Sequence, residues 1–395
     1  MMSLLKSLTR IGSFAAKELL EVVRRPGAFM SLVIGPFLIM AIFGMGYSGY
    51  RRPLDTVLVL PPQTGISRDP ATYQRLAGPA IHVVAVTADA NAALAELRAQ
   101  QIDLVVIAPP DLRQRLRAGQ QSDIEVEYNE TDPVRAGNAS VLATQLSDKV
   151  NQQIIQDVVL KGEQSPVGQA AGTSIPPNVV AQPTVGKPVN IAPTTPTLAL
   201  YFAPAVLALI LQHMGVTLTA LSVVRERLHG TMELFRVSPA SPVEILLGKY
   251  IGFGILSGVI SLVTLGLMVL VLHVPDLGQA GLLAAIVALL VFASLGLGLL
   301  ISVVADSESQ AVQLSLLVLL ASVFFGGLVL PLTEFQPIVG NAAYALPVTS
   351  AIDLLQNWML RGTLLRPWEL GVLVGLGAVL FVLTALQLRR IVLKG

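Results

Sequence analysis

Long apolar runs divide the chain, and each is long enough to cross a lipid bilayer. A helix needs about 20 predominantly apolar residues to span the hydrocarbon core. Runs of this kind predict membrane-spanning helices at residues 26–48, 198–224, 248–273, 281–304, 312–331 and 369–388. The pattern therefore predicts an α-helical integral membrane protein with six transmembrane helices.

The pattern changes between the first and second apolar runs. Apolar segments there shorten to strand length, at 56–60, 81–86, 103–107 and 124–128, and helical patterns separate or follow them. Strands that alternate with helices indicate an α/β domain, which we place at residues 54–162. Residues 163–197 are rich in proline, which lacks the N–H that a helix or central strand needs, so they are predicted to be a linker.

The cations at the two ends of the chain predict its orientation. In residues 1–25, apolar positions recur at steps of three and four among Lys and Arg. This pattern indicates an amphipathic helix along the membrane surface, although a cytosolic helix without lipid contact fits it too. Arg389, Arg390 and Lys394 follow the last span. The positive-inside rule then places both termini in the cytoplasm and the α/β domain on the extracytoplasmic side.

Composition supports a membrane protein and excludes several chemistries. Hydrophobic residues make up 53% of the chain and charged residues only 13%. The net charge is +1 with no long basic tract, so no nucleic-acid partner is expected. The chain has no cysteine and only four histidines, which argues against disulfides, thiolate chemistry and a metal site.

A charged stretch between two of the apolar runs does not fit inside a bilayer. It includes Arg225, Glu226, Arg227, Glu233 and Arg236. Each Arg, Lys or Asp at a helix centre costs roughly 2.5–3.5 kcal/mol on insertion, so the stretch is predicted to lie in water.

A structured element follows the charged stretch. Ser241 and Pro242 suit the N-cap and first position of a helix, and Glu244 closes a capping box. That helix runs through Gly248 and Lys249 into the next span.

These residues resemble the loop that follows the second span in ABC-2-type transport permeases. The family pattern is roughly E-R-E-x-G-T-x-E-x-L, a proline turn, and E-I-x-x-G-K. The matching residues are Glu226, Gly230, Thr231, Glu233, Leu234, Pro239, Glu244, Ile245, Gly248 and Lys249. One extra residue, within Leu228-His229, departs from the pattern before the Gly-Thr pair. In the family this loop docks on a separate ATP-hydrolysing subunit.

The resemblance implies two groups of site residues. The expected docking residues are Arg225, Glu226, Arg227, Gly230, Thr231, Glu233 and Leu234. The expected transmission helix, which passes movement into the membrane, contains Ser241, Pro242, Glu244, Gly248 and Lys249.

The chain shows no catalytic motif of its own. It lacks the G-x-x-x-x-G-K-[ST] of a phosphate-binding loop, since Gly248-Lys249 is followed by Tyr250. It also lacks the G-x-S-x-G of a serine hydrolase. We expect no catalytic residue, no bound cofactor and no enzyme activity in this chain. The resemblance implies that ATP and Mg²⁺ are bound by the partner ATPase.

Polar residues inside the predicted spans are rare. Gln212 and His213, in the second span, are candidates for the translocation path, because intramembrane polar groups are often functional. The alternative is a histidine that only hydrogen-bonds a neighbouring helix. Lys249 is expected to be an interfacial anchor, Glu308 to lie in a solvated turn, and Asp353 to be a surface charge on an outer helix.

Together these observations predict the permease subunit of an ATP-binding-cassette exporter in a bacterial inner membrane. The resemblance implies a cytosolic ABC ATPase and a second permease copy or paralogue as partners. A hydrophobic or amphiphilic substrate suits spans so poor in polar groups. The alternative is a non-transporting receptor or scaffold whose outer domain binds a ligand or protein. A neighbouring gene for an ABC ATPase would favour the transporter.

Overall fold

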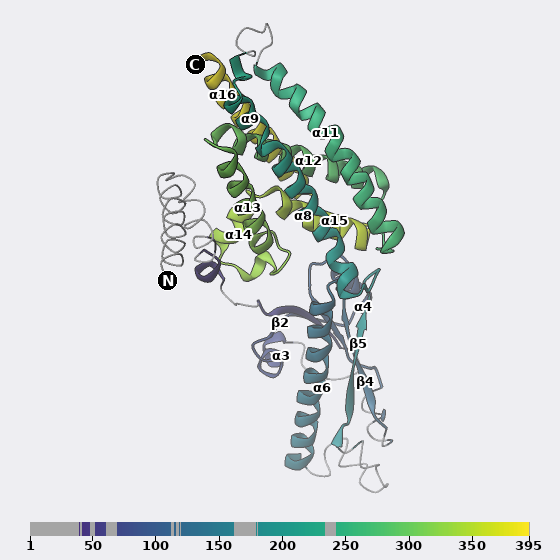
Figure 1. Ribbon diagram of the computed structural model, residues 1–395. Helices are drawn as coiled ribbons and strands as arrows, with labels where there is room; N and C mark the ends of the chain where they lie inside the picture. Colours follow the sequence, from purple (N-terminus) through teal and green to yellow (C-terminus); the bar gives the residue numbers. More distant parts are fainter. Residues whose placement is uncertain are drawn as a thin grey trace, which may run out of the picture. The chain divides into compact units, whose positions relative to one another are not determined.

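The computed structural model describes residues 39, 42–47, 52–60, 69–111, 114–115, 118, 120–161, 179, 181–233 and 242–394. The chain forms two compact units, which are described separately (Figure 1). One unit is Arg51–Tyr201, and the other combines Met1–Tyr50 with Phe202–Gly395.

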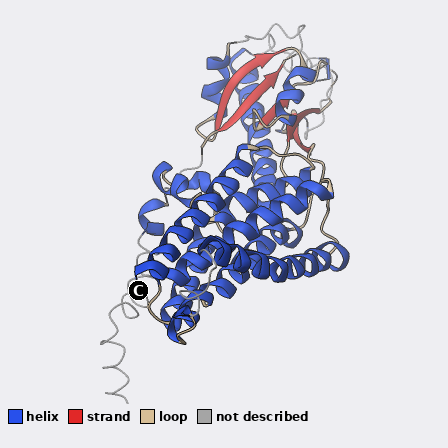
Figure 2. Ribbon diagram, turned by 90° about the horizontal axis from the view of Figure 1, so that it is seen from above, coloured by secondary structure: helices blue, strands red, loops and turns tan. Residues whose placement is uncertain are grey.

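The Arg51–Tyr201 unit is built on a five-stranded sheet in the order β2-β1-β3-β4-β5 (red in Figure 2). The strands are β1 (Leu54–Val59), β2 (Ile81–Thr87), β3 (Leu104–Ile107), β4 (Ser122–Tyr128) and β5 (Thr184–Asn190). β1 pairs in parallel with β2 and β3, β4 is antiparallel to β3, and β5 is parallel to β4. The four strands predicted from the sequence are present as β1 to β4.

Helices cover both faces of this sheet, and its central strands β1 and β3 place apolar residues on both faces. Val57 and Val59 of β1 pack with α4 (Ala90–Arg98) through Leu97. On the opposite face, Leu104 and Val126 pack with α6 (Pro133–Lys161), and β2 packs with the short helix α3 (Pro70–Ala77). Figure 1 shows α6 running along the sheet beside β5.

The fifth strand corrects the predicted linker. Residues 184–190 lie within the range 163–197 but pair with β4 over their full length. Pro188 is tolerated because β5 is an edge strand, which leaves one side of its backbone unpaired. Asn151 of α6 holds the strand by accepting from the Thr184 N–H at 2.7 Å and donating to the Thr184 carbonyl at 2.8 Å.

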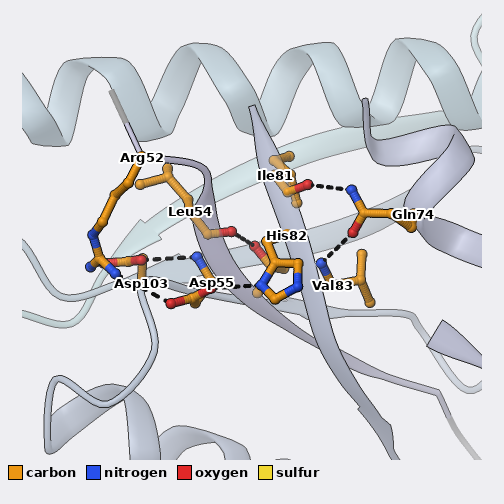
Figure 3. A network of polar contacts seen from close by, with 9 residues as sticks. Arg52, Leu54, Asp55, Gln74, Ile81, His82, Val83 and Asp103 are labelled. Atoms are coloured by element: carbon orange, nitrogen blue, oxygen red, sulfur yellow. Dashed lines mark hydrogen bonds and ion pairs between the residues drawn. The ribbon is translucent and has the colours of Figure 1, made fainter. Parts of the chain in front are cut away.

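A polar network fixes the start of the sheet domain (Figure 3). Arg52 contacts Asp103 at 2.8 Å and Asp55 at 3.2 Å, and Asp55 also lies 2.8 Å from Nδ1 of His82. The Asp103 carboxylate accepts the backbone N–H of Asp55 at 2.9 Å. Arg52 is thereby attached to β1 and to the residue before β3, and Asp55 links β1 to β2.

The other unit is helical. Among the described residues, five helices are long and apolar enough to cross a membrane: Leu198–Leu228, Pro242–Val271, Ala280–Val304, Glu308–Phe325 and Trp368–Ile391. They correspond to α8 (Leu198–Ala220) with α9 (Ser222–Leu228), α11 (Pro242–Gly266) with the π-helical turn η4 (Leu267–Val271), α12 (Ala280–Val304), α13 (Glu308–Phe325) and α16 (Trp368–Lys394).

The helix α12 is the centre of this unit. It is apolar all round, as a buried helix must be, and packs against α16, α15, α11 and α9. α11 is the least covered, with Ile255 and Leu262 among its exposed side chains, which suits contact with lipid. The short helices η5 (Leu332–Glu334) and α14 (Pro337–Ala343) precede α15 (Pro347–Arg361).

The segment before the last span is a bent pair of helices. α14 and α15 meet at an 85° bend, and the pair counts as one further candidate span if its helices are taken together. Much of α15 is buried, including Leu354, Leu355 and Met359. The predicted helix 1–25, most of the first span 26–48, and most of the range 163–183 lie outside the described residues.

Candidate functional site

The charged stretch begins as a helix rather than a loop. α9 continues α8 after a single break at Leu221, so Arg225–Leu228 form the helical end of the second predicted span. The break leaves the N–H groups of Val223 and Val224 to be satisfied from outside, and both donate to Ser302 Oγ of α12, at 2.8 and 3.0 Å. We call residues Arg225–Glu233 the charged tip.

Glu226 of the charged tip is turned inward, toward α11. Its Oε1 atom lies 2.5 Å from Lys249 Nζ, which also donates to Ser222 Oγ at 2.8 Å. The side chain of Lys249 is only 10% exposed and that of Glu226 26%. Lys249, expected from the sequence to be an interfacial anchor, is an ion-pair partner of Glu226. Glu226, an expected docking residue, joins α9 to α11 through this contact.

The two arginines attach the charged tip to other helices. Arg225 Nε contacts Glu308 Oε2, in the first turn of α13, at 3.0 Å. Arg227 donates to the carbonyl of Ala305, the residue that caps the end of α12. Glu308 was expected only to be solvated. The tip is thus connected by side chains to α11, α12 and α13, all in the same unit.

The tip ends in a turn that requires glycine. Gly230 has φ = +75°, a region that favours glycine, and no atom lies within 4 Å of the position of a Cβ. Gly230 directly follows His229, the residue that caps the end of α9. The Thr231 hydroxyl donates to the Glu226 carbonyl at 3.0 Å and closes the turn. Leu228, His229 and Glu233 are exposed around it. Leu234 and Ser241, both predicted site residues, lie outside the described residues.

An open groove of about 550 Å³ lies between α9 and α11. Glu226 and Lys249 line this groove. It is also lined by Glu244, in the first turn of α11, and by two glycines of the same helix, Gly248 and Gly252. Pro242 is the first residue of α11. The described residues of the predicted transmission helix therefore lie next to the charged tip.

The polar pair in the second span divides into two different roles. Gln212 is 1% exposed and fully engaged: its Nε2 donates to Ser322 Oγ of α13 at 2.6 Å, and its Oε1 accepts the Val348 N–H of α15 at 2.7 Å. These contacts connect three helices, so Gln212 has a structural explanation. Nδ1 of His213 is buried and has no hydrogen-bond partner among the described residues. His213 remains a candidate for the translocation path.

Sequence reasoning missed Ser302 and the pairing of Glu308. Ser302 is one of two serines in the otherwise apolar helix α12, and such serines commonly bond within their own helix. Glu308 follows Ser307, which caps α13 by accepting the Gln310 N–H at 3.2 Å. The Ser307 cap places Glu308 in the first turn of α13. The contact with Arg225, which is distant in the sequence, is visible only in the folded structure.

Comparisons with known proteins agree with this architecture. The family described as "ABC-2 family transporter protein" matches residues 27–386. The chain is 24% identical over 361 residues to the "Probable multidrug ABC transporter permease YbhS" of Escherichia coli K12, covering 91% of this chain and 90% of that protein. It is 28% identical over 302 residues to the "Inner membrane transport permease YhhJ" of the same organism, covering 75% of each. The chain therefore belongs to the ABC-2 family of transporter proteins.

Proposed function

We propose that this chain is the permease subunit of an ABC exporter and that a separate cytosolic ATPase subunit docks on the charged tip. The family match and the relatives named as permeases support a membrane subunit of an ABC transporter. ATP and Mg²⁺ are bound and used by the partner. A second copy of the chain, or a paralogue, completes the transport unit.

One observation carries the mechanism: side chains of the charged tip contact three other helices. Glu226 pairs with Lys249 of α11, Arg225 with Glu308 of α13, and Arg227 with the carbonyl at the end of α12. A displacement of the tip by a docked ATPase is therefore transmitted to α11, α12 and α13 together. A merely solvated loop would have no reason for so many contacts to the helices.

The docking surface consists of the residues of the charged tip that make none of these contacts and remain exposed. It includes Leu228, 54% exposed, and the exposed residues His229 and Glu233 around the Gly230 turn. An exposed leucine beside an acidic side chain suits a protein partner with an apolar pocket and a basic rim. Glu226, Arg225 and Arg227 are assigned to transmission.

The remaining proposals concern orientation and substrate. The tip and both termini are cytoplasmic and the sheet domain extracytoplasmic, in a bacterial inner membrane, on the cation bias at the chain ends. The substrate is a hydrophobic or amphiphilic molecule moved outward. Support comes from the apolar character of the spans and from a relative whose printed name includes "multidrug".

The test separates docking from transmission. The chain is co-expressed with a candidate ABC ATPase subunit and purified in detergent. Leu228→Glu, on the docking surface, should lose the ATPase, whereas Lys249→Met should retain it but lose substrate-stimulated ATP hydrolysis. Gln120→Glu, in the sheet domain, is the matched surface control. Retention of a normally stimulated ATPase by both test variants would overturn the proposal.

A further inference from the structure

A buried acidic residue outside the charged tip has no place in the mechanism above. Glu369, in the first turn of α16, is 0% exposed. The Tyr344 hydroxyl donates to its Oε1 at 3.2 Å, and Arg366 Nη1 lies 3.8 Å from the same atom. Its second oxygen, Oε2, is buried and receives no N–H or hydroxyl donor from the described residues.

Asp353 of α15 is an acidic neighbour of Glu369, and the two carboxyl groups are in side-chain hydrogen-bonding contact. An ionised carboxylate can only accept hydrogen bonds, so two of them cannot bond to each other. One proton between them changes this contact from repulsive to a strong, charge-assisted hydrogen bond. The Glu369 carboxyl also has an oxygen without a donor, which is consistent with an additional proton at this group.

We propose that Asp353 and Glu369 form a proton-binding site in which one proton is held between the two carboxyl groups. The charged groups around the pair are consistent with one bound proton. With one proton the pair carries a single negative charge, which Arg366 balances, and Tyr344 contributes a neutral donor. Among the described residues, the ionisable groups that interact with Glu369 are Asp353, Arg366 and Tyr344. Without the proton, two negative charges would face one arginine in a buried position.

The shared proton connects α15 to the start of α16. When it leaves, two adjacent carboxylates repel each other and the contact between the helices is lost. While the site is occupied, the folded state holds a proton that the unfolded chain releases at neutral pH, so its contribution to stability is lost as pH rises and the site empties. The site is independent of the ATPase and of the charged tip.

The full chain, purified in detergent, is examined by infrared spectroscopy at a series of pH values. A protonated carboxyl group has a carbonyl band separate from those of carboxylates. We expect the native protein to show this band at neutral pH and to lose it at alkaline pH. Glu369→Gln removes the site's acid and should abolish the band. Asp353→Asn should also abolish it, because the asparagine amide donates to Glu369 in place of the proton.

The matched control is Asp306→Asn, which removes an exposed carboxyl group and should leave the band unchanged. The native titration needs no variant, so the proposal stays testable even if a substitution prevents folding. A native protein without the band at neutral pH contradicts the proposal. So does a band that persists with full intensity in Glu369→Gln.

Discussion

Lys249 Nζ lies 2.5 Å from Glu226 Oε1, and this ion pair joins the end of the second predicted span to the start of the third. Both side chains are mostly withdrawn from solvent, at 10% and 26% exposure. The pair sits beside an open groove and is joined by Ser222. It is therefore the central connection between the charged tip and α11.

Loss of one member of that pair should cost more than loss of an exposed pair nearby. Lys249→Met leaves Glu226 unpaired and should destabilise the membrane unit by about 2 kcal/mol, less than the ~3–5 kcal/mol typical of a fully buried pair. Lys249→Met combined with Glu226→Gln should recover part of the loss. Thermal unfolding in detergent measures the difference.

The control for that experiment is the exposed pair Arg225–Glu308, with side chains 55% and 40% exposed. Arg225→Met should cost no more than about 1 kcal/mol, because water and salt screen such pairs. Equal losses of stability in Lys249→Met and Arg225→Met would show that the Glu226–Lys249 pair stabilises the membrane unit no more than an exposed pair does.

Gln212 and His213 should respond differently to substitution. Gln212→Leu leaves the buried Val348 N–H and Ser322 hydroxyl without their partner, and should cost about 1–3 kcal/mol. His213→Ala removes no hydrogen bond seen among the described residues and should change transport or substrate preference instead. Unfolding and transport measured on both variants test this. A large stability loss in His213→Ala alone would reverse the two roles.

The sheet domain should need its fifth strand. A fragment of residues 52–195 should show a cooperative thermal transition, whereas residues 54–162 should be much less stable because they lack β5. Asn151→Ala should destabilise the longer fragment by about 1–3 kcal/mol, since it leaves the buried Thr184 N–H unpaired. Circular dichroism follows both transitions. Equal stability of the two fragments would mean that β5 contributes little.

The orientation can be tested because the chain contains no cysteine. Single cysteines at Gln120, in the sheet domain, and at His229, in the charged tip, are treated with an impermeant thiol reagent in intact cells. We expect labelling at position 120 and none at position 229 until the cells are opened. Labelling at position 229 in intact cells would place the charged tip outside the cell and contradict the proposed orientation.

Hydropathy was enough to predict the helical architecture, because a run of about 20 mostly apolar residues is typical of a membrane-spanning helix. The alternation of strands and helices predicted β1 to β4 for a similar reason. β5 was missed because Gly186 and Pro188 argue against a strand. Gly186 is explained by the structure: a Cβ there would lie 2.5 Å from the Ala143 carbonyl oxygen of α6.

The candidate site was harder to predict than the fold. The sequence located the charged tip and the start of α11, but charge type alone does not say which side a residue faces. Glu226 and Glu233 look equivalent along the chain, yet only Glu226 comes near Lys249 in the folded structure. Asp353 and Glu369 belong to different helices, so their proximity depends on the packing of α15 against α16.

The central claim is that the exposed part of the charged tip binds an ATPase subunit. Glu233→Lys reverses an outward charge, and Gly230→Trp places a large side chain at a turn with φ = +75°. Neither residue lies in the hydrocarbon-crossing part of a helix, so membrane insertion should persist. Breaking one side of an interfacial charge pair costs about 2–5 kcal/mol, which lowers affinity roughly 30-fold or more.

The direct measurement is the amount of ATPase that co-purifies in detergent with the native chain, with Glu233→Lys and with Gly230→Trp, each normalised to the permease. Glu233→Gln is the matched control, since it removes the charge without reversing it and should have the smaller effect. We predict that both test variants lose most of the ATPase while the permease remains folded in the membrane. Full retention of an ATPase that still responds to substrate, in both variants, would contradict the account.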